Sequence, residues 1–168
     1  IVAECGEKGV QGAVIVATGF SANGREDPAS IATLRLRADR HGVRILGPGS
    51  LGVIRTDINL NAACGPGQPL PGRLALVSQS GALCAAILDW SRTRHVGFST
   101  LISTGMGADV DFGEILDFLA RDPATDSIML YMEGVENARR FMSALRAAAR
   151  MKPVLVMKAG RHAERPDS

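Results

Sequence analysis

In the second half of the sequence, short apolar runs alternate strictly with longer segments of helical periodicity. The strand-like runs are 74–77, 98–103, 128–130 and 153–157, and the helical segments are 81–94, 111–120 and 137–150. Parallel strands need long crossover connections, usually helices, and these crossovers are right-handed. The alternation therefore predicts an α/β fold with a doubly wound parallel sheet over residues 73–168.

The first half has fewer elements. We predict a helix that ends before Gly9, a strand at 13–17, a helix at 28–41 and a strand at 43–46. Two strands resemble the trailing part of a Rossmann-type domain, which we place at residues 1–58. The segment 59–72 shows no periodicity and holds three prolines, which predicts a linker.

Composition excludes several classes of protein. The 19 Lys and Arg and 17 Asp and Glu are dispersed, and aromatic residues are only 4%, which disfavours nucleic-acid binding. No apolar run approaches the roughly 20 residues that span a membrane. Cys5, Cys64 and Cys84 lack the spacing of a zinc site, and their odd number predicts a reducing, cytoplasmic environment.

A glycine-rich turn follows the second predicted strand. Gly47-Pro-Gly-Ser-Leu-Gly52 formally matches the dinucleotide fingerprint, but the residues after it do not open a helix. Pro48 also removes an amide that a phosphate could use. A structural or ligand-lining turn is favoured over NAD binding.

The segment around Ser80 is more informative. The run 74–77 ends, two serines follow, and Gly81 opens a helix. The amides of Ser80, Gly81 and Ala82 would point from the helix N-terminus toward an anion, which predicts phosphate binding. An ordinary serine N-cap explains the same residues equally well. A serine nucleophile is disfavoured because no glycine lies two residues before either serine.

Three acidic residues also follow strands or precede helices. Glu133 ends the third strand of the second half, where the ligand crevice of an open α/β sheet lies. Its carboxylate could accept a hydrogen bond from an imidazole, whereas the alternative is a solvated or helix-capping residue. For Asp109 and Asp111, capping is favoured over a metal site, and we predict no metal site in the chain.

Together these motifs resemble the CoA-ligase family that includes the succinyl-CoA synthetase α subunit and the NDP-forming acyl-CoA synthetases. The motifs are Gly-Pro-x-Ser-Leu-Gly at 47–52, the whole stretch 70–82, Gly105-x-x-Ala-Asp-Val-Asp-Phe112, Glu133 and Lys158-Ala-Gly-Arg161. Other stretches resemble the synthetase-like part of bacterial protein lysine acetyltransferases: 59–62, 87–90, 97–100 and 138–143.

The resemblance implies a CoA-binding Rossmann domain followed by a flavodoxin-like ligase domain. In such enzymes an acyl phosphate forms, CoA attacks it, and a histidine carries the phosphoryl group to a nucleotide on an ATP-grasp domain. By position, Ser80, Gly81 and Ala82 resemble the phosphoryl-binding helix terminus, and Glu133 the glutamate that orients the histidine. Gly47, Pro48 and Ser50 resemble a loop near CoA, although the family usually has Asn in place of Gly49.

The resemblance also implies that the chain is a fragment. The histidine normally follows the Lys-Ala-Gly-Arg segment in a His-Thr-Gly loop, and His162 does not match it. The expected function is an NDP-forming acyl-CoA synthetase acting on CoA, a small carboxylic acid and ATP or ADP, with an ATP-grasp partner. The alternative is a non-catalytic regulatory module that binds acyl-CoA and is linked to a GNAT-type lysine acetyltransferase domain.

Overall fold

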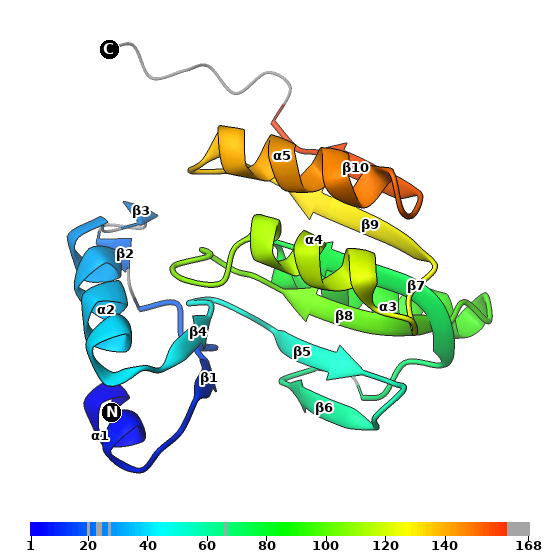
Figure 1. The fold of residues 1–168 in the computed structure, drawn as a ribbon. Coiled ribbons are helices and arrows are strands. Elements are labelled where there is room, and N and C mark those ends of the chain that lie inside the picture. Colours follow the sequence, from blue (N-terminus) through cyan, green and yellow to red (C-terminus); the bar gives the residue numbers. More distant parts are fainter. Residues whose placement is uncertain (20, 23–24, 27, 66, 161–168) are drawn as a thin grey trace.

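The computed structural model describes residues 1–160 except 20, 23–24, 27 and 66, and it divides into two units (Figure 1). In the first unit, two parallel strands pair directly and two helices pack beside them. Its elements are α1 (Val2–Glu7), β1 (Gly12–Val14), β2 (Ser21–Ala22), β3 (Arg25–Glu26), α2 (Pro28–His41) and β4 (Arg44–Leu46). The small core of this unit includes Leu34 and Ala38 of α2 and Ile45 of β4.

The second unit is a six-stranded sheet with the order β10-β9-β7-β8-β5-β6. Its elements are β5 (Gly52–Arg55), β6 (Leu60–Ala63), β7 (Pro71–Ser78), α3 (Gly81–Thr93), β8 (Phe98–Ser103), α4 (Phe112–Arg121), β9 (Ser127–Met132), α5 (Ala138–Ala149) and β10 (Val154–Lys158). Strands β7 to β10 pair in parallel, which confirms the predicted parallel sheet.

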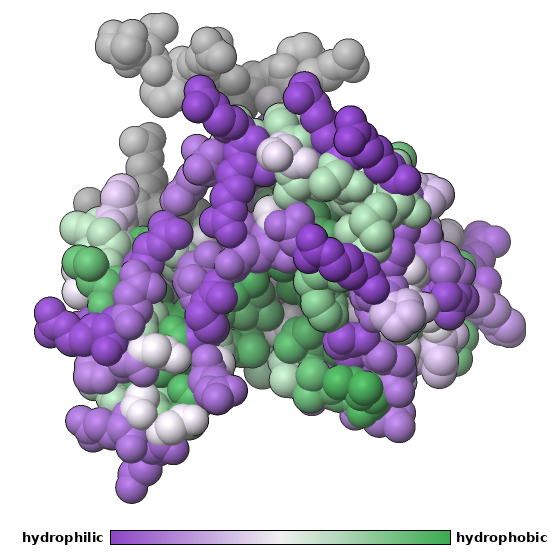
Figure 2. All heavy atoms as spheres, in the orientation of Figure 1, coloured by the Kyte–Doolittle hydropathy of each residue, from purple (hydrophilic) through white to green (hydrophobic). Residues whose placement is uncertain are grey.

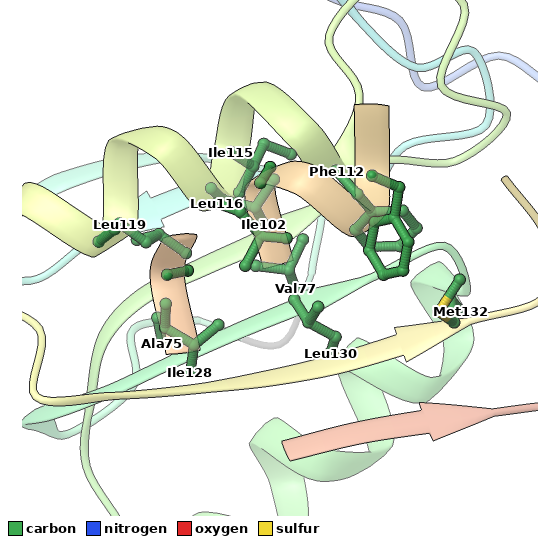
Figure 3. Packing of buried hydrophobic residues seen from close by; sticks show 14 residues of the cluster. Ala75, Val77, Ile102, Phe112, Ile115, Leu116, Leu119, Ile128, Leu130 and Met132 are labelled. Carbon is green, nitrogen blue, oxygen red and sulfur yellow. The ribbon is translucent and has the colours of Figure 1, made fainter. Parts of the chain in front are cut away.

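Helices cover both faces of this sheet because alternate residues of each strand point to opposite faces. Ala75 and Val77 of β7 point toward Leu116 of α4 (Figure 3). Phe141 of α5 belongs to the same cluster. Leu76 points to the other face and packs with Leu88 of α3 in a second cluster. Burying a side chain such as Leu116 stabilises the fold by roughly 1.5–3 kcal/mol.

In the second unit, α3, α4 and α5 each begin directly after a residue whose side chain caps the helix. Ser80, Asp111 and Asn137 accept hydrogen bonds from amides three residues on, at 3.2, 3.0 and 2.9 Å. Such caps satisfy one of the backbone amides that a helix leaves unpaired at its start. The capping role predicted for Asp111 is confirmed.

The segment 59–72, predicted as a linker, instead contains a strand. β6 pairs antiparallel with β5, and β5 pairs antiparallel with β8, so both extend the sheet of the second unit. The sheet of the second unit therefore begins at Gly52, before the predicted boundary at residue 58. Leu60, Asn61 and Ala62 are exposed on this edge strand, so the sequence carries no apolar alternation that would reveal it.

The two units are joined by an ion-pair cluster around Arg44. Its guanidinium donates to both carboxylate oxygens of Asp109, at 2.9 and 3.1 Å, and to Glu114 at 2.6 Å. The Ile45 amide also donates to Asp109, at 2.7 Å. Burial alone raises the pKa of Asp109, but the hydrogen bonds from Arg44 and the Ile45 amide outweigh it, so this pKa lies below its ordinary value. Asp109 thus joins the units and does not cap a helix, contrary to the sequence-based expectation.

Candidate functional site at the carboxyl edge of the sheet

The N-terminus of α3 opens at the carboxyl end of β7, as predicted. The amide of Ser80 already donates to Ser78 Oγ at 3.0 Å, which corrects the expectation that three consecutive amides are free. Among the described residues, the amides of Gly81 and Ala82 have no hydrogen-bond partner. These two amides, with the helix dipole behind them, remain available to an anion.

Gly81, the first residue of α3, lies close to the end of β8. A Cβ there would lie 3.6 Å from Ser103 Oγ and 3.5 Å from Leu51 Cβ. The Ser103 hydroxyl is buried and has no hydrogen-bond partner in the described part of the chain. Because buried hydroxyls are normally paired, this donor beside α3 supports a polar ligand or water at the helix terminus.

Glu133 lies at the same edge of the sheet. It directly follows β9, and β9 is the parallel neighbour of β7, with Tyr131 in register with Ser78. The expectation that Glu133 and the Gly81 helix terminus share one edge is confirmed. Glu133 does not cap α5, since Asn137 does so, and its exposed carboxylate makes no hydrogen bond or ion pair with the described residues.

A cleft of about 620 Å³ lies beside Glu133. Its walls come from the ends of β7, β8 and β9, from the N-termini of α4 and α5, and from Arg35 of α2. The carboxyl ends of β8 and β9 point toward α2 in Figure 1, and hydrophilic residues crowd the surface along this junction in Figure 2. Arg140 lines the cleft and lies 3.3 Å from Asp111 and 3.4 Å from Glu114.

Two further residues contact the Glu133 segment and were not singled out from the sequence. Gln79 Oε1 accepts hydrogen bonds from the amides of Glu133 and Gly134. Lys158 Nζ donates to the Glu133 carbonyl at 2.7 Å. Both residues lie in the motifs that carry the family resemblance, but only the strand register reveals that they meet at Glu133.

The turn at 47–50 holds the two units together. Gly47, Pro48 and Ser50 are buried, and the Gly47 and Pro48 carbonyls accept amides of the loop after β8, at 3.0 and 2.9 Å. Ser50 Oγ donates to the Ser103 carbonyl and accepts from the Gly52 amide. Their polar groups are thus engaged inside the protein, and a contact of these three residues with CoA stays a prediction. A strand, β5, and not a helix follows the turn. The turn therefore lacks the helix N-terminus that a dinucleotide fingerprint requires.

Several other expectations concern single residues. The cysteines Cys5, Cys64 and Cys84 are free thiols, and burial raises the pKa of Cys84 to about 12, so this thiol is unreactive at neutral pH. Within the described ranges, no three His, Cys, Asp or Glu side chains group as metal ligands. None of the described helices is long and apolar enough to cross a bilayer. Arg161 and His162 lie outside the described residues.

Parallel strands with helices on both faces, and a helix terminus and a carboxylate at the carboxyl edge, define a flavodoxin-like α/β domain. Residues 71–167 match the family model described as the succinyl-CoA ligase-like flavodoxin domain. The chain belongs to this family, which confirms the fold class and the resemblance given by the motifs.

Known relatives share most of this chain but are much longer. It is 46% identical over 160 residues to an ADP-forming acetate–CoA ligase I of Archaeoglobus fulgidus, covering 95% of this chain and 23% of the relative. It is 43% identical over 161 residues to the α subunit of ADP-forming acetate–CoA ligase I of Pyrococcus furiosus, covering 96% and 35%. The chain therefore spans about a quarter to a third of these proteins.

A solved structure has the same fold. It is acetyl-coenzyme A synthetase 1 of Ca. Korarchaeum cryptofilum in complex with phosphate and ADP, with a TM-score of 0.89 and 37% identity. The match covers 95% of this chain and 34% of that one. At this identity the likeness extends to the sequence as well as the fold.

Proposed function

We propose that the chain is part of an ADP-forming acyl-CoA ligase, which joins a small carboxylic acid to CoA while ATP is converted to ADP and phosphate. The observation that carries the proposal is that Glu133 and the Gly81–Ala82 amides follow the carboxyl ends of two adjoining parallel strands, β9 and β7, at one sheet edge. The relatives named as ADP-forming acetate–CoA ligases support it, and acetate is accordingly the first acid to test.

In this proposal, the helix terminus and the carboxylate have separate tasks. The amides of Gly81 and Ala82 bind a phosphoryl group and stabilise the negative charge on its oxygens. Glu133 accepts a hydrogen bond from the histidine that carries this group, which fixes the imidazole tautomer and stabilises its charged form. Among the described residues, no histidine lines the cleft, so that histidine comes from outside them.

The same proposal names the other components. ATP or ADP binds to an ATP-grasp domain or subunit, and CoA attacks the acyl phosphate near the junction of the two units. Three free thiols agree with a cytoplasmic location. Neither the described residues nor the relatives named above offer an observation that favours the regulatory module linked to an acetyltransferase.

An assay of the full-length protein with any separate ATP-grasp subunit tests this function. With acetate, CoA and ATP, we expect acetyl-CoA, ADP and phosphate to form in equal amounts, as measured by chromatography. Omitting either the acid or CoA should abolish product formation. If no member of a panel of straight-chain and aromatic acids supports acid-dependent ADP release, the ligase function is refuted.

A phosphate titration followed by NMR tests the helix terminus. We expect saturable shifts of the Gly81 and Ala82 amide signals, with a rise in melting temperature, because a ligand that binds only the folded state stabilises it. The Gly72 amide is an internal control, because it lies near the start of β7, at the opposite end of that strand from α3. Equal shifts at Gly72, or none at Gly81, would remove the proposed site.

A further inference from the structure

Gln79 is tied to the end of β9 through both its backbone and its side chain. Its amide donates to the Tyr131 carbonyl at 3.1 Å. Its Oε1 accepts the amides of both Glu133 and Gly134, the second at 3.0 Å. One side-chain oxygen thus takes two consecutive backbone donors of the segment that carries the proposed catalytic carboxylate.

The other side of Glu133 is held by Lys158. Its Nζ donates to the carbonyls of Glu133 and Ala159, both at 2.7 Å. The Ala159 amide in turn donates to the Met132 carbonyl at 2.9 Å. The backbone of Glu133 is therefore fixed at its amide and at its carbonyl, while the carboxylate is left free toward the cleft.

We propose that Gln79 is a positioning residue, which holds the Glu133 carboxylate in place relative to the phosphate-binding terminus of α3. The proposal rests on the function proposed above. Gln79 directly precedes Ser80, the N-cap of α3, so its side chain ties the chain at the start of α3 to the Glu133 segment. No helix or strand holds residues 133–137, so these hydrogen bonds fix the backbone from which the carboxylate extends. A misplacement of a catalytic group by about 1 Å is enough to lower the rate of an enzymatic reaction about 100-fold.

The kinetic test uses Gln79→Met, which keeps the length of the side chain but removes the acceptor. In the full-length enzyme, we expect the rate of phosphoenzyme formation to fall about 10- to 100-fold. The KM for ATP should stay unchanged, because the nucleotide binds elsewhere. Gln68→Met is the matched control: the same substitution is made at an exposed side chain before β7, and it should leave the rate unchanged.

A double-mutant cycle distinguishes positioning from general support of the fold. If Gln79 acts through Glu133, Gln79→Met should cause no further loss in a Glu133→Gln background. A loss by the same factor in both backgrounds would overturn the proposal. Gln79→Glu, which restores an acceptor oxygen at the same length, should recover the hydrogen bonds to the Glu133 and Gly134 amides.

Amide hydrogen exchange separates this proposal from the ligase function, because it needs no turnover. In the full-length protein, Gln79→Met should speed exchange of the Glu133 and Gly134 amides at least about 10-fold. Gln79→Glu should restore the protection, and Gln68→Met should leave it intact. Unchanged exchange in Gln79→Met refutes the positioning role even if the enzyme is an active ligase. Faster exchange in a protein without ligase activity refutes the proposed function and leaves only a structural hydrogen bond.

Discussion

Replacing Glu133 with glutamine should lower the rate of phosphoenzyme formation by about 100-fold or more, the scale of losing a positioned electrostatic or acid–base partner. Glutamine keeps the size of the side chain and can still accept a hydrogen bond, but it cannot stabilise a positively charged imidazole. The stability of the fold should change by less than about 0.5 kcal/mol, because the carboxylate is exposed and makes no hydrogen bond or ion pair with the described residues. Rapid-quench labelling with radioactive ATP measures the rate, and thermal unfolding measures the stability.

The neighbouring acid Glu136 offers a matched control for this experiment. Glu136 is exposed, lines the same cleft and belongs to the same segment, with its carboxylate 3.9 Å from Arg35. Glu136→Gln removes the same charge from the same cleft, so it reports the general electrostatic effect. We expect it to change the rate less than about threefold, in line with the small energies of exposed ion pairs. Equal rates in both variants and the wild type would remove Glu133 from the mechanism.

The regular elements could be predicted because their signals are local. The helix predicted at 28–41 is α2. The predicted bounds of α3 differ by one residue at its C-terminal end, and those of α4 and α5 differ by one residue at each end. Each of the last three helices starts after a capping side chain and buries an apolar stripe. Capping and apolar periodicity involve residues within one or two helical turns of each other. They can therefore be recognised in the sequence without knowledge of the tertiary structure.

What escaped prediction depends on contacts between distant residues. β6 is an exposed edge strand, and its pairing with β5 comes from position in the sheet rather than from an apolar pattern. Asp109 sits just before a helix and resembles a cap, yet its partner Arg44 is 65 residues away in sequence. A long-range ion pair leaves no local signature that would distinguish it from a capping residue.

The candidate site likewise has a part that could be predicted from the sequence and a part that could not. Strand alternation alone places Glu133 and the α3 terminus at one edge, because the carboxyl ends of parallel strands lie together. The finer arrangement depends on register: Gln79 meets Glu133 because Ser78 is opposite Tyr131. The occupied amide of Ser80 depends on the side-chain rotation of Ser78, which no sequence pattern indicates.

The contact between the two units should be highly sensitive to a single methyl group at Gly105. The residue has a φ of +55°, and a Cβ there would lie 2.1 Å from the Pro48 carbonyl oxygen and 2.7 Å from the Gly49 carbonyl carbon. These are backbone atoms of a buried turn, so they cannot rotate away as a side chain would. Gly105→Ala should destabilise the protein by about 3 kcal/mol or more, since the backbone displacement adds to the strain of the left-handed conformation.

Gly107 isolates the effect of crowding from that of conformation. It lies in the same loop with a φ of +64°, but a Cβ there would meet nothing within 4 Å. Gly107→Ala should therefore cost only the conformational strain, about 1 kcal/mol. Alanine restricts the unfolded chain equally at both positions, so that contribution cancels in the comparison. For a protein of this size, the expected drops in melting temperature are about 6–12 °C for Gly105→Ala and about 2–4 °C for Gly107→Ala. Equal drops in a thermal unfolding scan would show that the turn at 47–50 yields to the added methyl group, and that the loop after β8 does not depend on close contact with it.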